Sequence, residues 1–317
     1  MFRQSDGHVV RALTIGGSDS GGGAGIQADL KTMHQYDVYA MSVVTAVTAQ
    51  NTEGVQSILD VSPVFVRNQL TSIQDDIGTD AVKTGMLSTA EIIREVADFW
   101  TEGTHTPMVV DPVMIAKGGA HLLQPTAIEV LTHRLLPLAT VVTPNLPEAE
   151  TIVGYSLNTL DDCRRAARVI ANLGPQWVVI KGGHPPTGTP LERDQQSATD
   201  VVDFNSYAMD IVYSRDDEEF TYLATPRVAS QKTHGTGCTY SAVITALLAR
   251  RVHPLTAIAD AKSFIYHAIA RARAWDVGHG HGPTDHSTPP KQDSSIQHGQ
   301  LNIYRGQHWN AQEEIFK

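Results

Sequence analysis

The sequence contains little cysteine, no long apolar run and no excess of positive charge. Its only cysteines are Cys163 and Cys238, too few for a disulfide framework. They also lack the spacing of a metal site, and this cysteine content suits a reducing cytosol. No run approaches the roughly 20 apolar residues of a membrane-spanning helix, so we expect a soluble, cytoplasmic protein. The 24 basic and 34 acidic residues give a net charge of −10. We therefore do not expect a nucleic acid as a partner, because the sequence has no basic stripe that could neutralise its phosphates.

Linkers and internal repeats are also missing. A chain of 317 residues with 41% hydrophobic residues is able to bury a full core. No Pro/Ser-rich break divides it in the middle, so we predict a single domain over residues 1–286. From residue 287 the sequence turns polar and has too few apolar side chains to offset the entropy of ordering. We therefore expect residues 287–317 to form a polar C-terminal tail.

Short β-rich runs alternate with longer helical patterns along the chain. The predicted strands are residues 9–15, 41–48, 81–84, 108–111, 140–143 and 177–181. The predicted helices, with apolar residues at three- and four-residue spacing, are residues 24–36, 63–75, 89–100, 125–135, 160–173, 239–250 and 255–275. This alternation predicts an α/β fold, with a mainly parallel sheet covered by helices on both faces.

Two segments interrupt the alternation. Residues 51–54 lie between two β-like runs and read as a hairpin turn, so residues 50–60 could project over a site as a flap. Residues 185–196 are rich in Pro, Thr and charge, and β-like runs follow at 201–212 and 220–223. We interpret this second segment as a variable surface excursion without chemistry.

A glycine-dense turn follows the first predicted strand, at residues 16–25. It matches neither the dinucleotide pattern nor a P-loop, which would end in Gly-Lys-Ser/Thr. A tight turn before a packed helix is one explanation. The glycine density exceeds that need and favours a loop whose backbone a ligand approaches closely.

The segment Thr-His-Gly-Thr-Gly-Cys at residues 233–238 precedes an apolar helix. Amide groups of a Gly-x-Gly turn at a helix N-terminus are able to stabilise charge on a transferring phosphoryl group. The same field would lower the pKa of the Cys238 thiol and make it available as a base. The alternative is a small buried thiol at a helix end.

Polar residues stand at the ends of several predicted strands. Asp111 and Lys181 each end one, where open α/β sheets bind ligands. Asn145 and Glu148 are one turn apart and could hold the waters of a magnesium ion, although a helix cap explains them equally well. Lys262, on a predicted helix, reads on residue grounds as a solvated surface charge.

Three histidines near residue 280 invite a metal interpretation. His279, His281 and His286 are separated by glycine and lack a carboxylate or cysteine at ligand spacing. We therefore do not assign a metal site there. A loop facing a nucleotide, or a simple chain end, explains the segment equally well.

Taken together, these motifs closely resemble the hydroxymethylpyrimidine/phosphomethylpyrimidine kinases of the ribokinase-like superfamily. The resembling segments are residues 12–31, 49–52, 83–87, 143–149, 181–184, 233–238 and 278–283, so the resemblance covers about residues 12–286. It implies a three-layer α/β/α fold and two successive phosphoryl transfers from ATP, with Mg²⁺ as cofactor. These transfers convert 4-amino-5-hydroxymethyl-2-methylpyrimidine to its monophosphate and then its diphosphate in thiamine diphosphate biosynthesis.

The resemblance also implies roles for individual residues. Gln50 would hydrogen-bond the ring edge of the pyrimidine, in a pocket shaped by Gly17, Ala24, Met86, Val113 and Cys238. The residues facing ATP and its phosphates would be Asp111, Lys181, Thr236 and Lys262. Catalysis would rest on Gly235, Gly237 and Cys238, with Asn145 and Glu148 supporting Mg²⁺ through water. Departures from the family pattern are Tyr240, where a smaller aliphatic residue is common, the long segment 185–199 and the tail.

The expected mechanism is in-line attack of the substrate hydroxyl on the γ-phosphorus, with Cys238 accepting the hydroxyl proton. Pyridoxal kinase is the nearest alternative, because pyridoxal also carries a hydroxymethyl group on a flat heteroaromatic ring. A non-catalytic small-molecule-binding relative is the alternative from another class. A sugar kinase is disfavoured, because sugar-specific superfamily members generally carry Asp in place of Cys238. We expect a homo-oligomer, in the form of a dimer, although the sequence does not fix this state.

Overall fold

One sheet of eleven strands organises the computed structural model, which describes residues 7–103, 106–114, 122–123, 125–182, 207–288, 301–305 and 308–311. The strand order is β11-β10-β9-β8-β7-β6-β5-β4-β1-β2-β3. The parallel strands are β1 (Arg11–Asp19), β2 (Tyr39–Gln50), β4 (Ala81–Thr84), β5 (Met108–Val110), β6 (Val141–Val142) and β7 (Trp177–Ile180). Antiparallel strands flank them: β3 (Val55–Asp60), β8 (Tyr207–Ser214), β9 (Glu219–Pro226), β10 (Asn302–Arg305) and β11 (His308–Ala311).

All seven predicted helices are present, with ends shifted by a few residues. They are α1 (Gly25–Gln35), α2 (Pro63–Asp76), α3 (Ala90–Gly103), α4 (Pro125–Val130, continuing as a π-helical turn over Leu131–Leu135), α6 (Leu160–Ala171), α7 (Thr236–Ala249) and α8 (Pro254–Ala272). The short helix α5 (Leu146–Val153) was not predicted as an element. Its eight residues are too few for a periodic apolar pattern, and its start is fixed by a capping box and a proline in the first turn.

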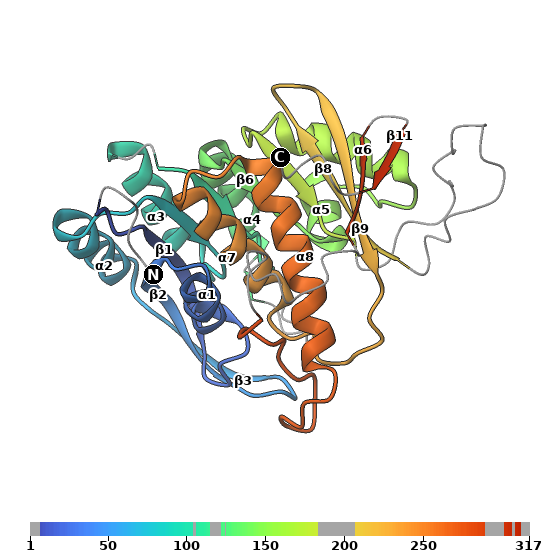
Figure 1. Cartoon of the computed structure of the whole chain (residues 1–317). Coiled ribbons are helices and arrows are strands. Elements are labelled where there is room, and N and C mark those ends of the chain that lie inside the picture. Colours follow the sequence, from blue (N-terminus) through green and yellow to red (C-terminus); the bar gives the residue numbers. More distant parts are fainter. Residues whose placement is uncertain are drawn as a thin grey trace.

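Helices cover both faces of the sheet, because successive strand residues point to opposite sides. Leu13 and Ile15 of β1 pack in one core with helices α2 to α6, whereas Ala12 of β1 contributes to the other core. That second core holds α1, α7 and α8, which lie side by side in Figure 1. The predicted α/β fold with three α/β/α layers is confirmed.

Part of the predicted polar C-terminal tail pairs within the sheet. Strand β10 pairs antiparallel with β9, β11 pairs with β10, and Leu301 is buried against the core. A strand added at a sheet edge is stabilised mainly by main-chain hydrogen bonds, so polar composition did not prevent it. Residues 185–196 lie outside the described residues, but the β-like runs that follow them form β8 and β9 within the sheet.

The strand order creates a crevice for ligands. Strand β1 lies between β4 and β2, so the chain leaves β1 toward one side and later returns to pair on the other. In open α/β sheets, ligands bind at such a switch point, beyond the carboxyl ends of the strands. No helix among the described residues is long and apolar enough to cross a membrane.

Candidate active site

A cavity of about 630 Å³ opens at the carboxyl ends of the parallel strands. Every residue predicted for the site lines it: Gly17, Ala24, Gln50, Met86, Asp111, Val113, Asn145, Glu148, Lys181, Gly235, Thr236, Gly237, Cys238 and Lys262. The wall is built from β1, the ends of β2, β4, β5 and β7, and the start of α7. Residues separated by more than 200 positions in the chain therefore share one site.

An ion pair between Asp111 and Lys181 forms the floor of this cavity. Lys181 Nζ lies 2.8 Å from Asp111 Oδ1, which also accepts a hydrogen bond from Thr143 Oγ1 at 3.1 Å. Burial alone would raise the pKa of Asp111, but Lys181 and Lys83 lower it below its usual value. Asp111 is therefore ionised, and the two strand-end charges meet as the sequence predicted.

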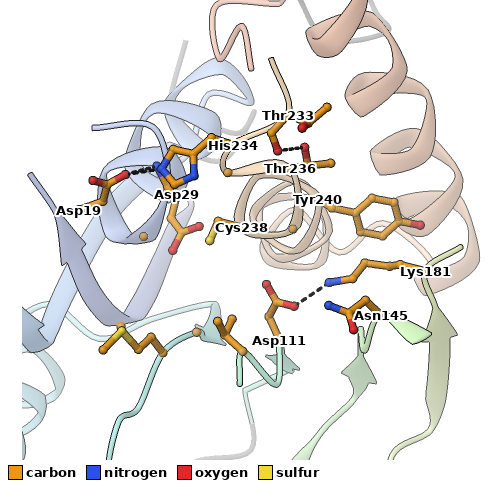
Figure 2. A pocket seen from close by; sticks show the side chains of 18 of the residues that line it. Asp19, Asp29, Asp111, Asn145, Lys181, Thr233, His234, Thr236, Cys238 and Tyr240 are labelled. Carbon is orange, nitrogen blue, oxygen red and sulfur yellow. Dashed lines mark hydrogen bonds and ion pairs between the residues drawn. The ribbon is translucent and has the colours of Figure 1, made fainter. Parts of the chain in front are cut away.

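The start of α7 faces this ion pair (Figure 2). A Cβ atom at Gly237 would lie 3.4 Å from Lys181 Nζ and 3.6 Å from Asp111 Oδ2. Gly235 has a φ of 80°, and a side chain there would overlap the carbonyl oxygen of Gly23. Thr239 N–H donates to the Gly235 carbonyl at 2.9 Å, so the N–H groups of Gly237 and Cys238 have no acceptor within the helix. They are free to bind an anion beside Lys181.

Asn145 and Glu148 form the capping box that the sequence left as an alternative. Glu148 N–H donates to Asn145 Oδ1 at 2.9 Å, and Asn145 N–H donates to Glu148 Oε2 at 2.8 Å. Both residues also line the cavity, and Asn145 pairs with Lys181 through an isolated bridge. Burial raises the pKa of Glu148 to about 7, with Asp111 acting in the same direction and Lys181 against it. Asn145 and Glu148 therefore cap α5 and also lie beside the Asp111–Lys181 ion pair in the cavity wall.

The glycine-dense turn closes on a carboxylate that the sequence analysis did not select. Asp19 accepts hydrogen bonds from the N–H groups of Gly21 at 2.8 Å, Gly23 at 3.1 Å and Ala24 at 2.8 Å. These three backbone N–H groups of the loop are therefore already hydrogen-bonded within the loop itself. Burial alone would raise the pKa of Asp19, but these bonds and a bond from His234 lower it.

His234 connects the glycine turn to the flap. Its Nε2 atom lies 2.8 Å from Asp19 Oδ2 and 3.3 Å from Gln50 Nε2 (Figure 2 shows the contact with Asp19). The bond to the carboxylate requires a proton on Nε2. Gln50, at the end of β2, contacts this ring on one side of its amide and lines the cavity on the other.

The predicted hairpin is confirmed, and a second loop packs on it. Strands β2 and β3 pair antiparallel around the turn at residues 51–54. Gly280 N–H donates to Thr52 Oγ1 at 3.2 Å, and a side chain at Gly278 would overlap Thr52. His234 N–H donates to the carbonyl of Gly282 at 3.0 Å. The glycine–histidine segment thus joins the flap to the Cys238 loop, and no group of three or more possible ligands for a metal occurs among the described residues.

Lys262 is buried, which corrects its interpretation as a solvated surface charge. Its Nζ atom lies 2.9 Å from Asp210 Oδ1, and both side chains are under a tenth exposed. Asp210 also accepts from Gly182 N–H at 3.1 Å and interacts with the hydroxyl of Tyr240. Asp210 and Ala208 of β8 line the cavity, whereas residues 185–196, interpreted as a surface excursion without chemistry, lie outside the described residues.

The expected lowering of the Cys238 pKa is also wrong. Burial raises the pKa of this thiol to about 11, although Lys83 acts to lower it. Desolvation of the thiolate therefore outweighs the field of the helix N-terminus. The other thiol, Cys163, is buried in the core of α6, away from the site.

The fold and the site together define a ribokinase-like kinase for small molecules. The profile of the phosphomethylpyrimidine kinase family matches residues 19–285, and the chain belongs to this family. The hydroxymethylpyrimidine/phosphomethylpyrimidine kinase of Bacillus subtilis is 42% identical over 88% of this chain and 95% of its own length. The enzyme of that name from Haemophilus influenzae is 44% identical over 88% of this chain and 97% of its own length.

Solved structures agree on the fold and on nucleotide use. Staphylococcus aureus pyridoxal kinase in complex with AMP-PCP and pyridoxal is 33% identical, with a TM-score of 0.78 over 95% of this chain and all of that one. The chain is therefore a phosphotransferase of a family that uses ATP.

Proposed function

We propose that this chain transfers the γ-phosphoryl group of ATP to the hydroxymethyl group of 4-amino-5-hydroxymethyl-2-methylpyrimidine, and then phosphorylates the monophosphate, in thiamine diphosphate biosynthesis. One observation carries the proposal. The Gly235–Cys238 turn lies against Asp111 and Lys181 in a cavity that also contains Gln50. The relatives from B. subtilis and H. influenzae bear the names of both activities.

Catalysis in this proposal rests on positioning and charge. The free amides of Gly237 and Cys238, with Lys181, bind the phosphoryl group as negative charge develops on it. Lys262 and Thr236 face the nucleotide phosphates, and Asp111 orients Lys181 through their ion pair. Gln50 binds the ring edge of the pyrimidine. The substrate hydroxyl attacks the γ-phosphorus in line, and its proton passes to the sulfur of Cys238.

Mg²⁺ fits the oxygen-rich side of the cavity. Glu148 is buried, its carboxylate faces Lys181 and Asp111, and oxygen ligands are those that Mg²⁺ prefers. The capping bonds occupy Asn145 Oδ1 and Glu148 Oε2, which favours a cation held through its waters over one bound directly. When bound, the cation neutralises charge on the ATP phosphates.

The direct test is incubation of the protein with ATP, Mg²⁺ and the aminopyrimidine alcohol, followed by separation of the products over time. We expect monophosphate to appear first and diphosphate to follow. Absence of both products would overturn the proposal and leave a non-catalytic binding role. Omitting Mg²⁺ and adding EDTA should abolish turnover.

Pyridoxal is the second candidate substrate, because several structural relatives are pyridoxal kinases. The two substrates should be compared at equal concentrations. In the main proposal, Gln50→Leu raises the KM for the aminopyrimidine and has little effect on any pyridoxal turnover, since Gln50 reads the amino-substituted ring edge. A higher kcat/KM for pyridoxal than for the aminopyrimidine would favour the second candidate.

We further propose a cytoplasmic homodimer whose catalytic unit spans residues 1–286. Supporting the dimer, exposed apolar side chains lie at the edge strand β3 and the start of α2: Leu59 is 71% exposed, Val64 70% and Phe65 57%. Large apolar side chains this exposed mark interaction sites when they cluster. Sedimentation analysis of the protein and of a Leu59→Lys, Phe65→Lys variant tests this, with a monomeric wild-type protein as the contrary result.

A further inference from the structure

A buried ion pair beside the cavity has no part in the mechanism described so far. Lys83, the third residue of β4, donates to both carboxylate oxygens of Asp29 on α1, at 2.8 and 2.7 Å. Thr14 Oγ1 adds a bond to Asp29 Oδ2 at 2.7 Å. The side chains are 1% and 2% exposed, yet both residues line the cavity.

Such a pair is a poor way to stabilise a core. Two charges lose their hydration on burial, and replacement by apolar side chains of similar volume is often neutral or stabilising. On its own face of the sheet, the adjacent residues of β1 and β4 are the buried, apolar Ala12 and Ala81. The position of the pair in the cavity wall points to a use for its charge.

The group that the pair faces is Cys238. Figure 2 shows the Asp29 carboxylate and the Cys238 sulfur as neighbours below the start of α7. The main charged groups acting on this thiol include Lys83 from β4, Asp29 from α1, Asp111 after β5 and Lys181 after β7. Lys83 favours the thiolate more strongly than Asp29 disfavours it.

We propose that Lys83, held in place by Asp29, is a positioning residue whose charge favours the thiolate form of Cys238. This inference rests on the proposed function, in which that thiolate accepts the hydroxyl proton. In the step, the substrate O–H bond breaks, its proton passes to Sγ, the O–P bond forms and the bond to ADP breaks. Cys238 ends as a neutral thiol, which returns its proton to solvent. Lys83 keeps its own proton, because burial alone would lower the pKa of its ammonium but Asp29 and the other nearby acidic groups raise it.

Alkylation of Cys238 by iodoacetamide tests the inference without any substrate. A Cys163→Ala background leaves one thiol, and the pH dependence of the alkylation rate reports its thiolate fraction. We expect Lys83→Met to lower the rate at pH 8.5 at least about tenfold and Asp29→Asn to raise it by a similar factor, the change produced by about one pKa unit. Shifts of opposite sign are the signature of charge, since a loosened structure would move both variants in the same direction.

The double variant Lys83→Met, Asp29→Asn covers the case in which a single variant does not fold. It removes both charges and keeps an acceptor for Thr14, and we expect slower alkylation than in wild type because the larger influence is that of Lys83. Unchanged alkylation in the double variant, or single variants shifted in the same direction, would overturn the inference.

Turnover separates this inference from the proposed function. One result is that the Lys83 and Asp29 variants show the expected shifts in alkylation rate while Cys238→Ala loses equal activity in both phosphoryl transfers. That result would retain the influence of Lys83 on the thiolate and reject Cys238 as the base. Unshifted alkylation in an enzyme that makes both products would retain the function and reject the role of Lys83.

Discussion

Replacement of Cys238 by alanine should separate the two phosphoryl transfers. The alcohol must lose a proton in the first transfer, whereas the phosphate acceptor of the second is already ionised at neutral pH. Removal of a general base costs about 10²–10⁴-fold, so we expect a loss of that size in the first transfer. The second should fall by less than about tenfold, the residual effect of a changed cavity wall.

The pKa of this thiol gives the prediction a second, independent form. Burial raises it to about 11, so the thiolate is a minor species at neutral pH and its fraction grows about tenfold per unit of pH. The rate of the first transfer in the wild-type enzyme should therefore increase steeply between pH 7 and 10. In Cys238→Ala this dependence should disappear, and the second transfer should be flat in both proteins.

Initial rates measured separately from the alcohol and from the monophosphate, at saturating ATP, test both forms. Cys163→Ala is the matched control, because it removes a thiol that lies in the core away from the site. Equal losses in the two transfers, or a steep pH profile that persists in Cys238→Ala, would refute the base role. A contribution to anion binding or packing would then remain for this residue.

Three further predictions concern the surroundings of the site. Gly235→Ala should abolish turnover, because the φ of 80° at this glycine and its contact with Gly23 exclude a side chain. The control is Gly154→Ala, where φ is 78° but the surroundings are open. It should cost only about 1 kcal/mol of stability and leave kcat unchanged. Burial raises the pKa of Glu148 from an ordinary 4.5 to about 7. The folded protein therefore favours the protonated carboxyl group, and its free energy of unfolding falls by up to about 3 kcal/mol as the pH rises from about 4.5 to above 7. Glu148→Gln should remove that loss in urea unfolding at pH 8 and lower kcat. The buried His286 has a pKa of about 4 against an ordinary 6.5, so stability is full above pH 6.5 and falls by about 3 kcal/mol toward pH 4. His286→Gln should not lose this stability between pH 6.5 and pH 4. If the variant loses as much stability as wild type over this range, His286 is not the group responsible.

Local patterns account for much of what the sequence predicted correctly. Apolar periodicity identified the buried faces of α1, α3 and α6, and short apolar runs identified the parallel strands. Strand-end charges such as Asp111 and Lys181 could be placed at one edge, because all parallel strands of one sheet end there. Glycine at 235 and 237 indicated a helix start open to an anion.

Other features depend on partners distant in sequence. Asp29 and Lys83 are 54 positions apart, and nothing in their local sequence distinguishes them from surface charges. Lys262 is likewise buried only because Asp210 of β8 meets it. Asp19 is, in the sequence, one polar residue in a glycine turn, and only the folded loop shows three backbone N–H groups converging on it.

The sequence by itself determined the α/β class, the order of the elements and the meeting of Asp111 and Lys181 at the carboxyl edge, since these follow from periodicity and from the polarity of parallel strands. Most of the other site residues, such as Gln50 and Met86, were predicted from the family resemblance. The tertiary structure alone decided the charge state of the site. Whether the pKa of a thiol at a helix N-terminus is lowered or raised depends on how deeply the thiol is buried and on which charges face it. For Cys238, burial and the opposed influences of Lys83 and Asp29 come from three separate elements, and only folding brings them together.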